Sequence, residues 1–201
     1  TTDGAVTVTQ GKLEGLSLSS LDFEEGSNQR IDLADNSIMT TMDSEWTASA
    51  WVNKESSGSW DTLWGIGNNG ETLLLGSNGD RIAMYSTKWT GAGPGIRANA
   101  SNLVIGQWHH CVWQYSATDE KAKMWLDGVE IDYDVSNTFT NPLVIGTSGG
   151  HEKRTFGTGE DNAESYDGKV RDMRWYNFKL SDDQVASLYS GSFNVTPDNW
   201  W

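Results

Sequence analysis

The 201-residue chain is short of the residues that cross-link a fold or carry it into a membrane. Its single cysteine, Cys111, excludes an internal disulfide bond and a cysteine-rich zinc site. No segment approaches the roughly 20 apolar residues that a membrane-spanning helix requires. We therefore expect a domain that is held together by its core and does not insert into a membrane.

Positive charge is also scarce. Lys and Arg number 14 against 28 Asp and Glu, which gives a formal net charge of -14 at pH 7. Binding a phosphate backbone requires clustered cations, so we expect no nucleic-acid partner. The acidity suits a calcium-containing, salty or extracellular setting, and it also keeps a domain dissolved. No signal peptide is visible and residue 1 is Thr, so we expect a processed product or an excised domain.

Tryptophan and glycine are plentiful, with 11 Trp and 22 Gly against 3 Pro, which favours a β-rich chain with many turns. Alternating segments recur from AVTVTQ to KVRDMRWYNF, separated by Gly, Asn, Asp and Ser, as in antiparallel sheets. One segment, LSDDQVASLYSG, predicts a short helix, with Ser181 and Gln184 as a capping box and Gly191 as its stop. No linker divides the chain, so we expect a single domain over 1–201.

The segment WLDGVEI carries the strongest short signal for a β-hairpin, because Asp127-Gly128 is flanked by alternating residues. With these two residues in the turn, Trp125 faces Glu130, and alternation separates a core side from an outer side. The predicted core side is Met124, Leu126, Val129, Ile131 and Tyr133, and the predicted outer side is Lys123, Trp125, Glu130 and Asp132.

The same alternation sorts the segments HHCVWQY and WTASAWV. It directs Cys111 and Trp113 toward the core and leaves Gln114 on the opposite side. In the second segment, Trp51 lies on the non-core side. The outer face of the sheet is therefore predicted to carry Gln114 and Trp125, with Trp51 on the same side.

The order of these signals resembles the laminin-G-like and pentraxin-like jelly rolls of the concanavalin A-like lectin/glucanase superfamily. The matching segments are LDFEEGSNQRIDL, WTASAWV, GQWHHCVWQY, KMWLDGVEI, PLVIGTSG and YDGKVRDMRWYNFKLSDDQVASLY. The resemblance implies an all-β fold, a two-sheet antiparallel jelly-roll sandwich with one short C-terminal helix. It also implies binding of glycans or protein partners at rim loops or on the concave sheet, often with calcium. The fold hosts enzymes as well, so it does not decide the function.

The segment EIDYD is the one candidate for catalysis. It resembles the catalytic strand of laminarinase-type glucanases, which reads Glu, aliphatic, Asp, aliphatic, Glu, but it departs from that pattern at Tyr133 and Asp134. Cα atoms four residues apart on a strand lie about 13 Å apart, whereas a retaining pair needs carboxyl groups about 5 Å apart. Lys123 is also placed to pair with Asp132 across the hairpin. We therefore expect no catalytic residues.

Binding of a sugar calls for exposed aromatic rings beside polar groups, because a pyranose has one apolar face and a rim of hydroxyls. The outer side of the hairpin offers such groups, and so do two long loops, STKWTGAGPGIRANASN and GTSGGHEKRTFGTGEDNAESYDG. The predicted ligand-binding residues are Trp89, Arg97, Gln114, Trp125, Glu130, His151, Arg154 and Phe156.

Calcium takes several oxygen ligands from one loop or from adjoining loops. The segment GEDNAE offers Asp161, Asn162 and Glu164 as predicted metal ligands, without the spacing of an EF-hand. Glu24 with Asp172 is a second possibility.

The leading hypothesis is a non-catalytic carbohydrate-binding module outside a cell or on a virus particle, with a glycan or polysaccharide as its partner. Two alternatives stay open. The first is a structural or adhesion domain that binds protein, and the second is a laminarinase-like glycoside hydrolase.

Overall fold

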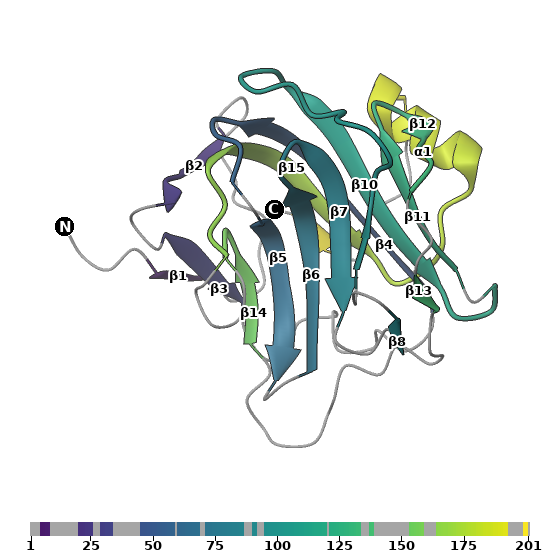
Figure 1. The fold of residues 1–201 in the computed structure, drawn as a ribbon, viewed down its shortest axis with the longest axis horizontal. Coiled ribbons are helices and arrows are strands. Elements are labelled where there is room, and N and C mark those ends of the chain that lie inside the picture. The colour runs from purple at the N-terminus through teal and green to yellow at the C-terminus, as the bar shows by residue number, and fades with distance from the viewer. Residues whose placement is uncertain are drawn as a thin grey trace.

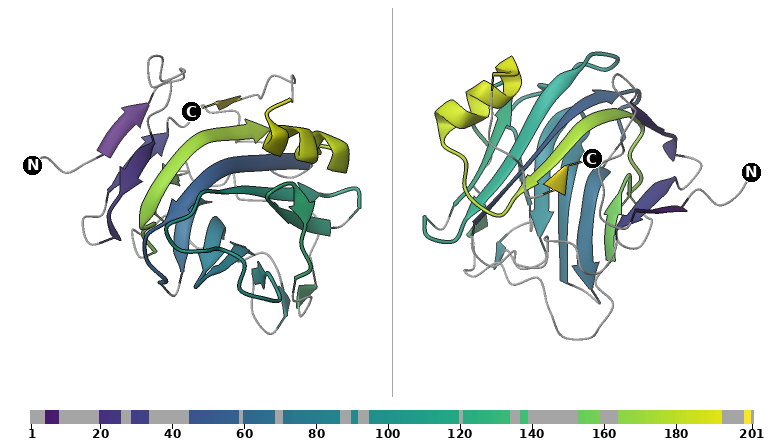
Figure 2. Two further views of the ribbon diagram at one scale, coloured as in Figure 1. Left: turned by 90° about the horizontal axis from the view of Figure 1, so that it is seen from above. Right: turned by 180° about the vertical axis from the view of Figure 1, so that it is seen from behind.

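Two β-sheets pack face to face, and one helix lies on the outer side of the second sheet (Figure 1, Figure 2). This confirms the predicted jelly-roll sandwich with a short C-terminal helix. The computed structural model describes residues 5–8, 20–25, 29–33, 45–58, 60–68, 71–86, 90–91, 95–119, 121–133, 137–138, 153–158, 164–192 and 199–200.

The first sheet, called the front sheet here, has seven described strands. In spatial order they are β1 (Ala5–Val8), β3 (Arg30–Leu33), β14 (Lys153–Phe156), β5 (Asp61–Asn68), β6 (Glu71–Asn78), β7 (Arg81–Ser86) and β9 (Gly95–Arg97). Its neighbouring strands pair antiparallel except at one end, where β1 pairs with β3 in parallel. Among the described strands this is the one parallel pair, so the sandwich is otherwise antiparallel as predicted.

The second sheet, called the back sheet, contains the two long strands that curve over the front sheet, β4 and β15 (Figure 2). Its strands are β12 (Val129–Glu130), β11 (Lys121–Leu126), β10 (His109–Ser116), β4 (Glu45–Lys54), β15 (Gly168–Tyr176) and β16 (Asn199–Trp200), with β2 (Leu21–Phe23) on β15. A separate pair joins β8 (Thr90–Gly91) and β13 (Asn137–Thr138), and the helix is α1 (Asp182–Ser190).

The main core lies between the two sheets and follows the predicted alternation. Cys111 and Trp113 of β10 are buried there. The indole N–H of Trp113 donates to the carbonyl of Ala83 on the front sheet at 2.9 Å, so its polar atom is satisfied inside the core. Large aromatic rings dominate this interior because each of them buries about 150–250 Å² of surface.

A second apolar cluster lies under α1, on the outer side of the back sheet. Helix α1 begins at the predicted capping box of Ser181 and Gln184 and ends at Gly191, whose φ of 73° is left-handed. Its buried residues, Val185 and Leu188, pack with Val112, Trp125, Tyr176 and Leu180. Both sides of the back sheet are therefore apolar where the helix covers it.

The predicted hairpin forms with the predicted turn. Asp127 (φ 51°) and Gly128 (φ 81°) both take positive φ, as type I′ turns require, and Trp125 pairs with Glu130. Two details differ from the prediction. Val129 is 67% exposed rather than in the core, and Lys123 pairs with Glu130 at 2.8 Å rather than with Asp132. The two-residue strand β12 ends at Glu130, before the register would bring Asp132 opposite Lys123.

Candidate functional site

The predicted platform of Trp125 and Gln114 is not on the surface. Trp125 is 1% exposed beneath α1. The side-chain amide of Gln114, also buried, donates to the carbonyl of Leu180 at 2.9 Å and to the hydroxyl of Thr47 at 3.1 Å. Alternation identified the non-core side of the sheet correctly but did not reveal that the helix returns to cover it. Both residues are therefore removed from the candidate ligand-binding surface.

Arg154 and Phe156 are also buried, which corrects their placement in a binding loop. The segment that carries them is strand β14, and their side chains point into the sandwich, 2% and 0% exposed. The ring of Phe156 packs edge-on against Trp64, with ring centres 5.7 Å apart. Four other predicted residues, Trp89, His151, Asp161 and Asn162, lie outside the described residues.

Arg97 and Glu130 are exposed, and Glu164 is partly buried. Glu130 accepts from Lys123 as described above, and the backbone carbonyl of Glu164 accepts from the amide of Thr62 at 3.0 Å. Arg97 donates to the side-chain oxygen of Asn78 at 3.3 Å, at the edge of the front sheet. Arg97 and Glu130 therefore remain accessible to a ligand, but the structure does not bring them together.

A more developed group lies on the outer side of the back sheet, beside the end of α1. Trp51 of β4 pairs in register with His110 of β10 on one side and with Arg171 of β15 on the other. Trp108 precedes β10. The guanidinium carbon of Arg171 lies over the Trp108 ring, 4.4 Å from its centre, and over the Trp51 ring at 5.4 Å. Both contacts are cation–π interactions, in which the indole rings attract the charge of the guanidinium.

Tyr189, in the last turn of α1, completes this group, which we call the Arg171 cluster: Trp51, Trp108, His110, Arg171 and Tyr189. The Trp51 ring lies 5.3 Å from the His110 ring and 5.7 Å from the Tyr189 ring. Tyr189 is 42% exposed, and Trp51, Trp108 and Arg171 are half-buried. The cluster thus presents aromatic surface and one cation to solvent. Sequence alternation found Trp51, but only the strand register joins it to Arg171.

The charge of the cluster comes from Arg171 alone. Burial lowers the pKa of His110 from 6.5 to about 4, so this imidazole is neutral at pH 7. Asp172, the next residue along the chain, takes a left-handed φ of 52°. Its two carboxylate oxygens accept hydrogen bonds from Nε and Nη2 of Arg174, at 2.7 and 2.9 Å. Among the described residues, Arg171 has no carboxylate partner.

Two polar atoms beside the cluster also lack partners. The Nδ1 atom of His110 and the side-chain oxygen of Asn53 are buried and make no hydrogen bond. Asn53 follows Trp51 by two residues on β4, so its side chain leaves the same face of the sheet. Buried polar atoms are ordinarily satisfied, so these two are candidates for contact with a ligand or a water.

An acidic group lies along the same face of the back sheet. One carboxylate oxygen from each of Asp22, Glu24 and Glu55 lies within 4.8 Å of the other two, and all three residues are exposed. Lys169 binds Glu55 and lies 3.7 Å from Asp22. Calcium binds oxygens at about 2.3–2.6 Å, so this spacing fits ligands around one ion. Glu24 thus meets Asp22 and Glu55 rather than the predicted Asp172, whose carboxylate is taken by Arg174.

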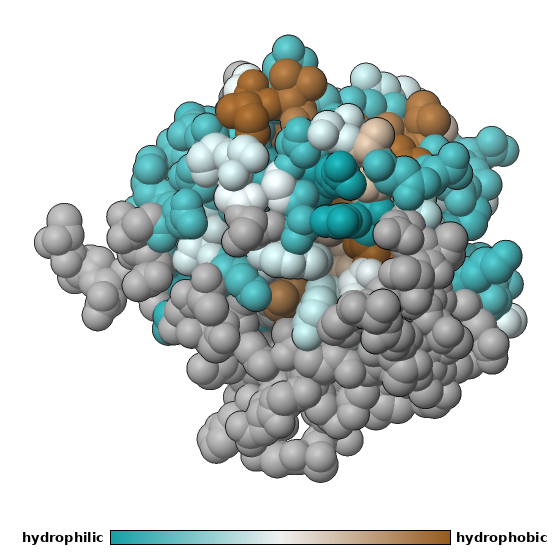
Figure 3. Space-filling model, viewed as in Figure 1, coloured by the Kyte–Doolittle hydropathy of each residue, from teal (hydrophilic) through white to brown (hydrophobic). Residues whose placement is uncertain are grey.

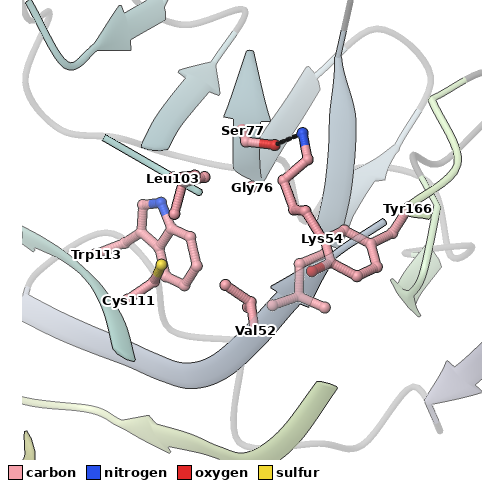
Figure 4. Close-up of a pocket in the computed structure, with 9 residues that line it drawn as sticks. Val52, Lys54, Gly76, Ser77, Leu103, Cys111, Trp113 and Tyr166 are labelled. Carbon is pink, nitrogen blue, oxygen red and sulfur yellow. Dashed lines mark hydrogen bonds between the residues drawn. The ribbon is translucent and has the colours of Figure 1, made fainter. Parts of the chain in front are cut away.

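The interior holds a small pocket between the sheets (Figure 4). Lys54 points toward Ser77, to which it donates at 2.8 Å, and it also binds the carbonyl of Gly79 at 2.6 Å and the carboxylate of Asp61. Burial raises the pKa of Asp61, against the opposing effect of Lys54. The pocket has about 10 Å³ of free volume, which is room for one water molecule. A sugar therefore does not fit there.

Comparisons with known proteins agree with this architecture. Residues 25–186 match the model of a laminin-G-type family described as the concanavalin A-like lectin/glucanases superfamily. A curated relative, C-reactive protein of Rattus norvegicus, is 30% identical over 131 residues, which cover 60% of this chain. The chain spans about half the length of that relative, 55%.

Two solved structures share the fold at low sequence identity. The IT-sialidase CBM40 of Ruminococcus gnavus, bound to α2,3-sialyllactose, is 15% identical with a TM-score of 0.69, over 85% of this chain and 96% of that one. A native heptameric SAP-like pentraxin from Limulus polyphemus is 13% identical with a TM-score of 0.56, over 74% and 71%. Within the described part of the chain, no helix is long and apolar enough to cross a membrane.

Proposed function

The chain belongs to the concanavalin A-like lectin/glucanases superfamily, and from that premise we propose that it is a non-catalytic carbohydrate-binding module formed by residues 1–201. The observation that carries the proposal is the Arg171 cluster. Its half-buried indoles and exposed Tyr189 provide apolar surface for the face of a sugar ring. Arg171 and Asn53 stand beside them as hydrogen-bonding groups for hydroxyls.

This arrangement matches the chemistry of sugar recognition. A pyranose offers C–H groups on one face, and aromatic rings bury such a face at low entropic cost because they have few rotatable bonds. The hydroxyl groups around the edge of the sugar ring need hydrogen-bond donors and acceptors beside them, which guanidinium and amide groups provide. The likeness to the sialidase module bound to sialyllactose supports a glycan partner, although that likeness extends to the fold alone.

A glycan array followed by calorimetry tests the proposal. Wild-type protein is compared with Trp108→Ala, which removes the ring closer to Arg171, and with Trp60→Ala, which removes a half-buried indole just before β5, near Tyr85. We expect the first variant to lose at least tenfold in affinity and the second to keep it. The proposal is contradicted if folded wild-type protein binds no glycan on the array, either with or without calcium.

The absence of catalysis is part of the proposal, and it is supported by the surroundings of Glu130. This carboxylate is exposed at the end of a two-residue strand and is paired with Lys123, which also lies 3.4 Å from Asp182. A general acid needs a raised pKa and a partner carboxyl group at a defined distance. The observed partner of Glu130 is an ammonium group rather than a second carboxyl group.

A second candidate function, binding to another protein, is favoured by exposed apolar side chains at one end of the sandwich. Val104 is 50% exposed, Ile105 41% and Val129 67%. The turn with Val104 and the hairpin turn with Asp127 are joined by His109, which bonds to both at 3.1 and 2.8 Å. Apolar groups are visible along the upper edge in Figure 3. Concentration-dependent self-association on a sizing column, lost in Val129→Ser, would favour this function.

We also propose a calcium site at Asp22, Glu24 and Glu55. The three side chains offer hard oxygen ligands, the donor type that calcium prefers, on an exposed surface. Lys169 occupies part of the same space and balances part of the negative charge. The protein's acidity is consistent with an extracellular setting, which we include in the proposal, whereas a virus particle gains no support from the relatives.

A further inference from the structure

We propose that the Arg171 cluster selects sugars that carry a carboxylate group. The inference rests on the proposed function and names the ligand class of the same site. It starts from a contrast of charge: the chain carries twice as many acidic as basic residues, yet Arg171 has no acid partner among the described residues. An external carboxylate would supply a partner that the described part of the chain does not provide.

Among the described residues, the other cations of the same strand, unlike Arg171, are each paired with an acid. On β15, Lys169 is bound by Glu55, and Arg174 is bound by both oxygens of Asp172. The register of β15 against β4 shifts between Arg171 and Arg174, where Asp172 adopts its left-handed φ. This bulge accompanies the pairing of Asp172 with Arg174, so the acid nearest Arg171 in sequence is already occupied. Bulges commonly redirect side chains beside binding sites.

The contacts of Arg171 leave its hydrogen-bonding edge available. The two indoles contact the guanidinium through their ring faces, 4.4 and 5.4 Å from the ring centres. A cation–π contact uses the positive charge of the group and consumes none of its N–H donors. Among the described residues, no hydrogen bond uses the side chain of Arg171. A planar carboxylate accepts two parallel N–H bonds from such an edge, which an alcohol does not.

The remaining members of the cluster suit the rest of an acidic sugar. Neutral His110 and the oxygen of Asn53 each have an unpartnered buried atom for a hydroxyl, and Tyr189 offers an exposed ring. The net charge of -14 disfavours chains with dense sulfate or phosphate, because every further anion meets repulsion. The ligand class that remains is a glycan with single, spaced carboxylates.

The test uses matched pairs of glycans. Oligosaccharides that carry a single carboxylate, such as a neutral oligosaccharide ending in one uronic acid, are each compared with the carboxyl-reduced form, in which the carboxylate becomes a hydroxymethyl group and the ring is unchanged. We expect the acidic member to bind wild-type protein at least tenfold more tightly in calorimetry. Arg171→Gln is expected to abolish the preference, and Arg171→Lys, which keeps the charge but not the planar fork, to reduce it.

Two further variants make the same change of charge elsewhere: Lys121→Gln is the control, and Arg97→Gln tests the accessible arginine that the sequence placed among the ligand-binding residues. Arg97→Gln removes the exposed arginine of the front sheet, and Lys121→Gln removes an exposed lysine at the far end of β11. Both are expected to keep the preference for the acidic member. Thermal melting of each variant checks that it is folded. If Arg171→Gln does not fold, Arg171→Lys still tests the role of the guanidinium.

The outcomes separate the inference from the function on which it rests. Equal binding of acidic and reduced glycans overturns the inference and leaves a carbohydrate-binding module. Loss of the preference in Arg97→Gln, but not in Arg171→Gln, also overturns it and moves the site to the front sheet. Tighter binding of densely sulfated chains than of uronates overturns the carboxylate class. No binding to any glycan overturns both proposals.

Discussion

The ring of Tyr189 stacks on the indole of Trp51, with ring centres 5.7 Å apart and an angle of 29° between the planes. Tyr189 belongs to the last turn of α1 and Trp51 to the central strand β4, so the contact ties the helix to the Arg171 cluster. The hairpin turn contributes to this fit. A Cβ atom at Gly128 would lie 3.1 Å from the Tyr189 ring, so only glycine leaves the ring its present space.

Replacement of Tyr189 by Ala is expected to weaken glycan binding at least tenfold. The change removes an exposed ring of the cluster and leaves the Trp51 indole without its stacked neighbour, and each stacked aromatic pair contributes about 0.5–1.5 kcal/mol beyond area burial. Calorimetry against the best array ligand measures the effect. Tyr189→Phe keeps the ring and should bind almost as wild type. Equal losses in the two variants would assign the effect to the hydroxyl and contradict the stacking argument.

Trp125→Ala is expected to change stability rather than ligand affinity. The indole is buried between the back sheet and α1, and truncation of a large buried aromatic costs about 3–5 kcal/mol. Urea unfolding measures the loss. Val129 directly follows the turn and its side chain is largely exposed, so Val129→Ser should change the free energy of unfolding by less than about 0.5 kcal/mol. A stable Trp125→Ala protein with impaired binding would restore this residue to the ligand surface.

The contrast between Trp51 and Trp125 shows what could be predicted from the sequence. Period-2 alternation placed both Trp51 and Trp125 on the non-core side of the back sheet, and both side chains do leave that side. Alternation is a local property of a strand, whereas burial depends on where a distant helix packs. The capping box and glycine stop predicted α1 itself, but not that its apolar residues Val185 and Leu188 would cover Trp125 and stop short of Trp51.

The candidate site was harder to predict for the same reason. Arg171 is 120 residues from Trp51 in sequence, and only the pairing of β15 with β4 brings them into register. The segment after residue 150 shows a second limit of prediction from sequence. Its length and glycines indicated a loop, but Lys153–Phe156 forms an inner strand of the front sheet, because Arg154 and Phe156 alternate into the core. Four residues of this kind do not stand out from a loop in sequence alone.

Stability is expected to fall as the pH is lowered from 6.5 toward 4, through the titration of His110. Burial depresses the pKa of this imidazole from 6.5 to about 4, so between these values the unfolded chain binds a proton that the folded protein does not. Stability therefore rises with pH across this window and is fully present above 6.5. The shift corresponds to roughly 3 kcal/mol at 1.36 kcal/mol per pKa unit.

His110→Phe is the matched variant for this prediction. It keeps an aromatic ring against Trp51 and removes the titrating group, and no hydrogen bond to Nδ1 is lost because that atom has none. Urea unfolding at several pH values between 4 and 7 should give a smaller loss of stability in the variant than in the wild-type protein. Parallel curves for the two proteins would show that other groups cause the acid sensitivity.

Calcium binding at Asp22, Glu24 and Glu55 is expected to be limited by Lys169. The ammonium binds Glu55 and lies near Asp22, so a calcium ion must displace it or share the carboxylates with it. The hydrogen bond to Glu55 raises the pKa of Lys169, which keeps the group charged at neutral pH. Lys169→Gln removes the competing cation and leaves three carboxylates close together. Calcium should then bind more tightly, because each carboxylate is free to serve as a ligand.

Thermal melting with millimolar calcium and with EDTA measures this, since a ligand that binds only the folded state raises the midpoint. The midpoint of Lys169→Gln should rise more with calcium than that of the wild-type protein. Lys179→Gln, which breaks a surface pair with Asp119 in the turn after β10, makes the same change of net charge and should respond as wild type. Glu55→Gln in the Lys169→Gln background should abolish the gain. Identical calcium responses in all these variants would remove the metal site from this surface.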